Sequence, residues 1–317
     1  MKPPNPPTRV VLAVLTFKRP DDLAAVVPAL VDQAGRAPVG FAVRVLIVDN
    51  DPLQSGRDLV ERAMPAALPI RVGYAAESEP GISAARNRAL DEAAEDDILV
   101  FIDDDERPVD SWLADLLACY EGHDHPAAVV GPVISAFDGE LDAWVAAGEF
   151  FNRRRLPTGT SVELAATNNL LLDLASVRRL GLRFDPEFGI SGGGDSLFTR
   201  TLSARGGRMV WCDEAIVYDM VPAARATRDW VLRRAFRMGN SWTRVSLALA
   251  DSPLAAARVR IVSGARGLVR VAGGAGRLAV GTLTRSARHQ ARGRRTMARG
   301  AGLLAGVVGY RYDEYRR

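Results

Sequence analysis

The first hundred residues alternate short apolar runs with amphipathic segments. Residues 10–15, 43–48 and 98–102 form runs that are largely apolar, a pattern typical of strands buried inside a sheet. Between them, residues 20–30 and 82–94 carry apolar side chains at helical spacing. Strands that alternate with helices predict an α/β fold with a parallel sheet.

A polar cluster follows each of these three apolar runs directly. The sequence Thr-Phe-Lys-Arg-Pro occupies residues 16–20, Asp-Asn-Asp occupies 49–51, and Asp-Asp-Asp-Glu occupies 103–106. In parallel sheets, ligands bind beyond the carboxyl ends of the strands. We therefore expect the three clusters to converge on one cleft.

Asp103, Asp104 and Asp105 are three adjacent carboxylates. Because like charges repel, this cluster costs stability unless a cation neutralises it. Mg²⁺ or Mn²⁺, which prefer oxygen ligands, would also hold a diphosphate. Alternation along an extended strand predicts that Asp103 and Asp105 point the same way. The alternative is a solvated acidic loop, which the buried strand before the cluster disfavours.

Three further groups each have a functional and a structural interpretation. Asp49 either accepts a hydrogen bond from a nucleobase N–H or forms a simple turn with its neighbours. Arg86, which follows a turn at Gly81, either reaches a phosphate or an acid of the cluster, or lies on a helix surface. Asp195 follows three glycines and is either the general base for an acceptor hydroxyl or the cap of a helix.

The composition is typical of a soluble globular enzyme, with 48% hydrophobic and 25% charged residues in a chain of 317. Two cysteines, Cys119 and Cys212, provide no disulfide framework and fit a reducing compartment. The start of the chain lacks the apolar segment of a secretory signal, and no apolar run is long enough to span a membrane. We expect a cytoplasmic protein, peripheral on the inner face of the cell membrane.

The net charge of +3 conceals a basic C-terminal region. Residues 253–317 hold 14 arginines and two acids, so the preceding 252 residues carry −9. Arginine alternates there with valine, leucine and glycine, which predicts an amphipathic surface for anionic lipid. The alternative is a helical hairpin that packs on the catalytic body or forms a homodimer. We expect no nucleic-acid partner, because the only aromatic residues there are three tyrosines.

In order and spacing, these clusters resemble the family 2 inverting glycosyltransferases, and most closely the branch that builds bacterial polysaccharides such as succinoglycan. No single motif carries the resemblance, which extends over residues 10–245. The matching segments are Leu-Thr-Phe-Lys-Arg-Pro at 15–20, Val-Asp-Asn-Asp at 48–51, Glu-Pro-Gly-Ile-Ser-Ala-Ala-Arg-Asn at 79–87, Phe-Ile-Asp-Asp-Asp-Glu at 101–106 and Gly-Gly-Gly-Asp at 192–195, with Trp211, Glu214-Ala215, Val221-Pro222 and Arg225.

The resemblance implies a GT-A-type nucleotide-sugar fold, with one mixed, mostly parallel central sheet flanked by helices. We expect a Pro-rich leader at 1–9 and a catalytic domain at 10–250. That domain would divide into a nucleotide-binding half at 10–125 and an acceptor half at 126–250, followed by a basic helical tail at 251–317.

The resemblance also implies roles for single residues. Asp105 binds the metal, Asp103 lies near the ribose and diphosphate, and Asp195 is the catalytic base. The chain departs from the family at Gly194, where glutamate is usual, and at Asp219, near which many members have histidine. The expected site has Asp195 as catalytic residue; Thr16, Phe17, Arg19, Asp49, Asp51, Arg86, Asp103 and Asp104 for the nucleotide-sugar; Asp105, Asp103 and Asp219 for the metal; and Trp211, Arg233 and Arg234 for the acceptor or diphosphate.

Together these expectations describe an inverting glycosyltransferase that depends on Mg²⁺ or Mn²⁺. It would move a sugar from a nucleoside-diphosphate sugar, with UDP favoured, to a hydroxyl acceptor that is lipid-linked, in polysaccharide or glycoconjugate biosynthesis. One alternative, a sugar nucleotidyltransferase, would carry a glycine-rich phosphate loop after the first strand, where residues 16–20 have no glycine. Another, an inactive scaffold that binds glycan or membrane, is left open by Gly194.

Overall fold

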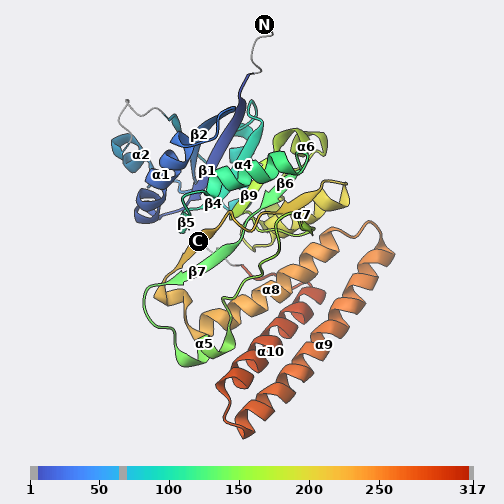
Figure 1. Cartoon of the computed structure of the whole chain (residues 1–317). Coiled ribbons are helices and arrows are strands. Elements are labelled where there is room, and N and C mark those ends of the chain that lie inside the picture. The colour runs from blue at the N-terminus through green and yellow to red at the C-terminus, as the bar shows by residue number, and fades with distance from the viewer. Residues whose placement is uncertain (1–5, 64–69, 314–317) are drawn as a thin grey trace. The chain divides into compact units, whose positions relative to one another are not determined.

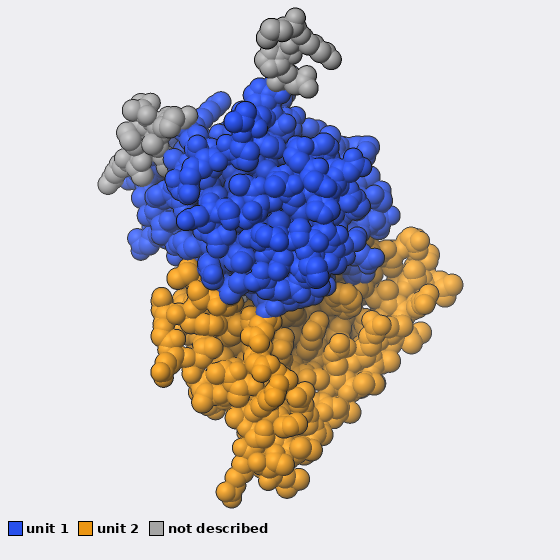
Figure 2. Space-filling view, in the orientation of Figure 1, with its two compact units in different colours: residues 1–134, 153–189, 198–219 blue, residues 135–152, 190–197, 220–317 orange. Residues whose placement is uncertain are grey.

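The computed structural model of the protein describes residues 6–63 and 70–313, and the chain forms two compact units (Figure 2). Unit 1 contains most of the strands and unit 2 contains the C-terminal helices. Unit 1 comprises Met1–Ile134, Arg153–Gly189 and Phe198–Asp219, and unit 2 comprises Ser135–Asn152, Ile190–Leu197 and Met220–Arg317.

Within the described residues, unit 1 is built on an eight-stranded sheet of order β3-β2-β1-β4-β9-β6-β10-β8 (Figure 1). The first four of these strands run parallel, and β9 is antiparallel to both of its neighbours. The strands are β1 (Thr8–Thr16), β2 (Phe41–Asp49), β3 (Val72–Ala76), β4 (Ile98–Asp103), β6 (Ala128–Val130), β8 (Ser161–Val162), β9 (Asn169–Asp173) and β10 (Met209–Trp211). The expected mixed, mostly parallel sheet is confirmed.

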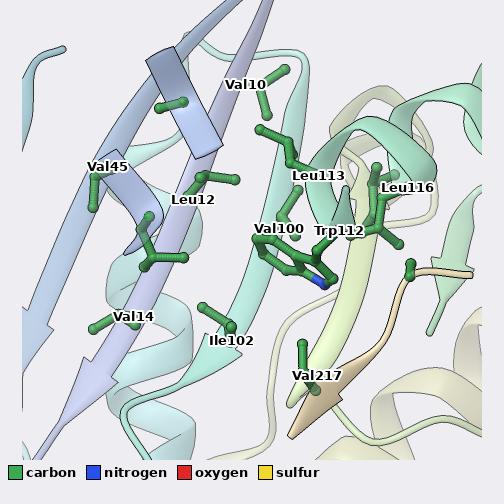
Figure 3. Close-up of a cluster of buried hydrophobic side chains, with 14 of the residues drawn as sticks. Val10, Leu12, Val14, Val45, Val100, Ile102, Trp112, Leu113, Leu116 and Val217 are labelled. Carbon is green, nitrogen blue, oxygen red and sulfur yellow. The ribbon is translucent and has the colours of Figure 1, made fainter. Parts of the chain in front are cut away.

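Alternate residues of β1 enter two different cores because successive side chains of a strand point to opposite faces. Val10, Leu12 and Val14 pack with α4 (Trp112–Gly122; Figure 3) and with α1 (Pro20–Gly35), whereas Val11 and Ala13 pack with the helices of the other face. The helices associated with this sheet are α1 (Pro20–Gly35), α2 (Arg57–Ala63), α3 (Ile82–Glu92), α4 (Trp112–Gly122), α6 (Leu174–Arg179), η1 (Pro186–Phe188) and α7 (Gly194–Ala204). Burial on both faces explains why the strands are almost entirely apolar.

A second, smaller sheet begins where β4 ends. In the described chain its three strands are β5 (Glu106–Pro108), β11 (Val217–Val221) and β7 (Val133–Phe137), in the order β5-β11-β7. Strands β5 and β11 are antiparallel, with Asp219 directly opposite Glu106. This register brings a residue of the C-terminal half beside the acidic cluster.

Unit 2 is mainly helical. Helix α10 lies along both α8 and α9 (Figure 1), and α9 and α10 form a hairpin. The helices are α5 (Ala143–Gly148), η2 (Ala223–Arg225), α8 (Arg228–Ala248), α9 (Pro253–Leu283) and α10 (Ala287–Val307). The expected helical tail is confirmed, and it has the form of a hairpin. None of the described helices has the length and apolar character needed to cross a membrane.

Glycines let the helices of unit 2 approach one another closely. A Cβ atom at Gly274 of α9 would lie 2.6 Å from Cγ of Met297 and 2.8 Å from the carbonyl oxygen of Gly293, both on α10. A Cβ atom at Gly302 of α10 would collide with the backbone carbonyl of Phe236 on α8. The packing of these helices therefore depends on backbone-to-backbone contact.

Candidate functional site

The carboxyl ends of β2, β1 and β4 lie side by side, as expected. Thr16 pairs with Asp49 in the register of β1 and β2, and Leu15 pairs with Asp103 in that of β1 and β4. The N–H of Asn50 donates to the carbonyl oxygen of Thr16 at 2.9 Å. The three polar clusters of the sequence therefore meet at one edge of the sheet.

The three aspartates of the cluster have different environments. Strand β4 ends at Asp103, and Asp104 and Asp105 lie in a turn, so the alternation of an extended strand does not continue to Asp105. Asp104 accepts hydrogen bonds from the hydroxyl of Thr16 and from Nη1 of Arg19, both at 2.9 Å. The same Nη1 atom donates to Asp105 at 3.0 Å. Thr16 and Arg19, both predicted for the site, thus hold the turn.

The acids at this edge are not fully neutralised by the protein. Burial, followed by repulsion from Asp105, raises the pKa of Asp103 to about 7, although the charge of Arg86 opposes the shift. Burial also raises the pKa of Asp104 to about 6, against the pull of Arg19. Burial alone would lower the pKa of Arg19, but Asp104 and Asp105 outweigh it and raise that pKa. The charged forms of these acids are thus disfavoured, and a bound cation would stabilise them.

Glu106 is a buried acid that the sequence analysis assigned to no role. Its carboxylate accepts from the side-chain amide of Asn168 at 2.6 Å and from the backbone N–H of Asp103 at 3.2 Å. Burial and the neighbouring Asp103 raise its pKa well above the ordinary value. Two sequence signals pointed here: Glu106 closes the acidic run, and Asn168 opens the polar-to-apolar transition before β9.

Asp219, expected as a metal ligand, lies opposite Glu106 and is paired with an arginine. Its carboxylate accepts from Nη2 of Arg153 at 2.6 Å. The Nε of Arg153 is buried and has no hydrogen-bond partner among the described residues. The structure therefore places a guanidinium, which the sequence analysis did not identify, beside the acids.

Asp49 is completely buried, and the protein itself occupies its carboxylate. One oxygen accepts from the N–H of Asp51 at 2.9 Å, and the other accepts from the N–H of Gly56 at 2.8 Å and the hydroxyl of Tyr74 at 2.9 Å. Asp51 accepts from the N–H of Leu53 at 3.1 Å, and although burial alone would raise its pKa, these local bonds lower it. The turn interpretation of this cluster is thus correct, and a base contact stays a prediction.

Arg86 is not a surface residue. Gly81, with φ of 116°, makes the turn before α3, and a Cβ atom there would lie 2.9 Å from the carbonyl carbon of Gly189. The turn aims Arg86 inward, where it is 9% exposed and its guanidinium lies 5.4 Å from the ring centre of Phe184. Its charge acts on Asp103, and its buried Nε has no hydrogen-bond partner in the described chain. Arg86 is therefore positioned to meet an anion.

Two aromatic residues of the expected site also belong to unit 1. The ammonium of Lys18 lies 5.1 Å from the ring centre of Phe17. Trp211 is buried, its Nε1 donates to Asp213 at 3.1 Å, and the guanidinium of Arg154 lies 5.9 Å from its ring centre. An arginine thus lies near the ring of Trp211, and the predicted role of Trp211 in acceptor or diphosphate binding stays a prediction.

The other predicted residues lie in unit 2. Asp195 is in the first turn of α7, and its carboxylate accepts from the N–H of Ser196 at 2.7 Å. Arg233 is exposed and pairs with Asp229 at 2.5 Å. The guanidinium of Arg234 lies 5.2 Å from the ring centre of Trp230. Their roles in acceptor or diphosphate binding stay predictions.

The acidic edge fits a divalent cation that binds together with a diphosphate. Among the described residues, no group of three or more histidine, cysteine, aspartate or glutamate side chains could hold an ion alone. Magnesium is commonly bound by one or two carboxylates, with phosphate and water completing its shell. Asp103 and Asp105 offer such carboxylates, whereas the carboxylate of Asp219 is bound to Arg153.

Similarity to known proteins extends over most of the chain. Residues 12–183 match the family model described as glycosyl transferase family 2. The succinoglycan biosynthesis protein ExoM of Rhizobium meliloti (strain 1021) is 33% identical over 242 residues, which are 76% of this chain and 76% of that protein.

Solved structures share the fold at lower identity. S. aureus TarS 1–349 in complex with UDP has a TM-score of 0.52 and 17% identity, covering 94% of this chain and 91% of that chain. In a longer TarS chain, only 55% is covered. GalNAc-T7 with UDP, GalNAc and Mn²⁺ has a TM-score of 0.53 and 14% identity, covering 76% of this chain and 51% of that chain.

Proposed function

Because the chain belongs to glycosyl transferase family 2, we propose that it transfers a sugar, with inversion, from a UDP-sugar to a hydroxyl acceptor with the help of Mg²⁺ or Mn²⁺. Membership of the family makes the protein a glycosyltransferase, and its similarity to ExoM supports a role in polysaccharide synthesis. What we propose beyond this is the identity of the nucleoside, the metal, the stereochemistry and the acceptor.

The observation that carries the proposal is the charge pattern at the sheet edge. Burial and the neighbouring Asp105 raise the pKa of Asp103 and so disfavour its charged form, and Arg86 presents a buried guanidinium beside it. Arg86 would bind a diphosphate directly, and Asp103 and Asp105 would hold a divalent cation that supplies positive charge next to it. One anion and one cation together would thus compensate the charges of this site.

Uridine is the base that we propose for the donor. Two proteins of the same fold, TarS and GalNAc-T7, crystallise with UDP. The GalNAc-T7 structure also contains Mn²⁺, which supports the proposed metal. Asp49 ends β2 and Asp51 follows it at the same edge, where a uracil ring would find buried polar groups.

In the proposed reaction, the carboxylate of Asp195 removes the proton of the acceptor hydroxyl. The acceptor oxygen then attacks the anomeric carbon as the bond to the diphosphate oxygen breaks, which inverts that carbon. Arg86 stabilises the charge that develops on the diphosphate. The cation, when bound at Asp103 and Asp105, supplies further stabilisation of this leaving group. Gly194 leaves Asp195 without an adjacent second carboxylate.

We propose a lipid-linked hydroxyl as the acceptor, which would place the enzyme at the cytoplasmic face of the cell membrane. Peripheral attachment through the C-terminal helices fits this location, because no described helix is suited to span a membrane. A homodimer through the same helices stays an alternative prediction.

The test compares Asp195→Asn with the wild type in the presence of UDP-sugar and Mg²⁺ or Mn²⁺. Because loss of a general base typically costs about 10²–10⁴-fold in rate, transfer should fall by that factor while UDP affinity stays unchanged. Asp185→Asn, the same change at the acid that caps η1, is the matched control and should retain activity. Wild-type turnover in Asp195→Asn would contradict the assigned base, and release of pyrophosphate in place of UDP would contradict glycosyl transfer.

A further inference from the structure

Helix α9 has two opposite faces. Ser263, Gly267, Gly274 and Gly281 are buried on one face, and the three glycines approach α10. Their spacing of seven residues is close to two helical turns, so they form one stripe along the helix. The stripe fixes the rotation of α9 and thereby determines which side chains face away from α10.

The opposite face of α9 is apolar and exposed. Large side chains recur there with helical spacing, and each is between 63% and 85% exposed: Leu254, Ile261, Leu268, Val269 and Leu283. At 1.5 Å per residue, the 31-residue helix presents this face over about 45 Å. An exposed apolar stripe of this length is unusual for a monomeric protein and indicates a binding surface.

The charged side chains of the two hairpin helices, α9 and α10, are all positive. Between residues 253 and 312 the chain has 12 arginines and neither aspartate nor glutamate. Arg258, Arg260 and Arg266 are exposed on α9 itself. A partner of this face must therefore accept apolar side chains in its interior and positive charge at its surface.

An anionic lipid bilayer meets both requirements. Leucine and isoleucine can enter the acyl boundary while long arginine side chains reach back to the head groups. A second copy of this chain would instead bring α9 against α9 and place the same arginines together, which is unfavourable. We propose that the exposed face of α9 lies in the interface of an anionic membrane, with the helix parallel to the bilayer plane.

The exposed apolar face of α9 is already formed in the free protein, because α9 is part of the hairpin. Because the glycine stripe holds α9 against α10, the apolar face is ordered before it meets a membrane, and little conformational entropy is lost on binding. The inference rests on the proposed peripheral location, and it names the surface responsible. It is independent of the transfer reaction, which is measured with soluble acceptor and without vesicles.

Co-sedimentation of the full chain with vesicles tests the inference. The wild type should bind vesicles of phosphatidylglycerol and phosphatidylcholine and should not bind phosphatidylcholine alone. The double variant Ile261→Gln, Leu268→Gln removes two exposed apolar side chains without touching the core, and its affinity should fall about tenfold or more. Replacing Arg258 and Arg266 by glutamine should weaken binding about fivefold per residue.

The matched control is Val39→Gln, which changes a fully exposed apolar residue of unit 1 and should bind as the wild type does. Equal circular dichroism spectra and equal donor affinity would show that the variants fold. Absence of wild-type binding, or equal binding by the Ile261, Leu268 variant, would overturn the inference. The inference would also be overturned if the wild type formed a dimer, the same variant dissociated that dimer, and vesicle binding stayed unchanged.

Discussion

The acidic edge of unit 1 and the helical hairpin of unit 2 use charge in opposite ways. At the edge, Asp104 and Glu106 are buried, and the surrounding protein compensates their charge only in part. On α9, Arg258, Arg260 and Arg266 are exposed to solvent and have no acid on their own helix. Buried charge costs folding free energy, whereas solvated charge costs little. The difference indicates that the edge binds a ligand that compensates its negative charge. The positive charge of the hairpin, by contrast, can attract an anionic surface from a distance.

The two regions also differ in what holds them together. The sheet of unit 1 is stabilised by apolar side chains on both faces, such as Leu12 and Val11 of β1. The α9–α10 contact depends on glycines that admit backbone atoms. A substitution at the acidic edge should therefore lower the rate of transfer, whereas a substitution in the hairpin should lower the free energy of unfolding.

The largest expected effect concerns the chemistry of the edge. Asp103→Asn removes a carboxylate from the site proposed for the cation and diphosphate, so transfer should fall about 10²–10³-fold, the range typical for loss of one electrostatic contact. Asp97→Asn, just before the amino end of the same strand, is the matched control and should leave transfer unchanged. Steady-state kinetics with saturating UDP-sugar measure both. Similar losses in the two variants would show that the edge has no special role.

The next effect concerns packing in the hairpin. Gly274→Ala adds a Cβ atom within 2.8 Å of a backbone oxygen of α10, so it should lower the free energy of unfolding by about 1–3 kcal/mol. Gly273→Ala meets nothing within 4 Å and should raise it by about 0.5–1 kcal/mol, because alanine favours the helix. Urea unfolding followed by circular dichroism compares these neighbours. If both substitutions change the free energy of unfolding in the same direction, helix propensity, and not the close approach of α10, determines their effect on stability.

The same contrast explains what the sequence could predict. The convergence of the three polar clusters follows from local patterns, because each apolar run identifies a strand and parallel strands end at one edge. The α/β class and the tail helices follow from spacing in the same way, whereas the mixed sheet was expected only from the resemblance to the family. These features depend on residues that are close in sequence.

The contacts of Asp219 and Arg86 could not be predicted in this way. Asp219 lies opposite Glu106 through the register of β5 and β11, which are more than a hundred residues apart in sequence, and it pairs with Arg153, which lies outside both strands. Arg86 is buried because Gly81 packs on Gly189, which no local pattern indicates. From the sequence alone, Gly274 is only a residue that disfavours a helix. Its role in packing depends on the position of α10, which the sequence does not give. Long-range packing decides all three.

The last prediction concerns a pH dependence of stability at the edge. In protein without metal and donor, the pKa of Asp103 is about 7 and that of Asp104 about 6, both above the value near 4 that is usual for an unfolded chain. Between these values the folded state holds more protons than the unfolded state, so the free energy of unfolding falls as pH rises. This contribution is fully present below pH 4 and is lost by about pH 7.

Asp103→Asn removes the contribution of Asp103, which extends to about pH 7. In EDTA, the wild type should lose thermal stability between about pH 5 and pH 7 relative to the variant, and the two melting temperatures should converge as pH falls towards 4. Acids paired with arginine, such as Asp91, have lowered pKa values, so their contribution to stability is lost as pH falls below 4. This contribution is the same in the wild type and the variant. Parallel melting curves over the whole range would mean that Asp103 is already ionised at little cost, and the charge contrast between the two units would then be lost.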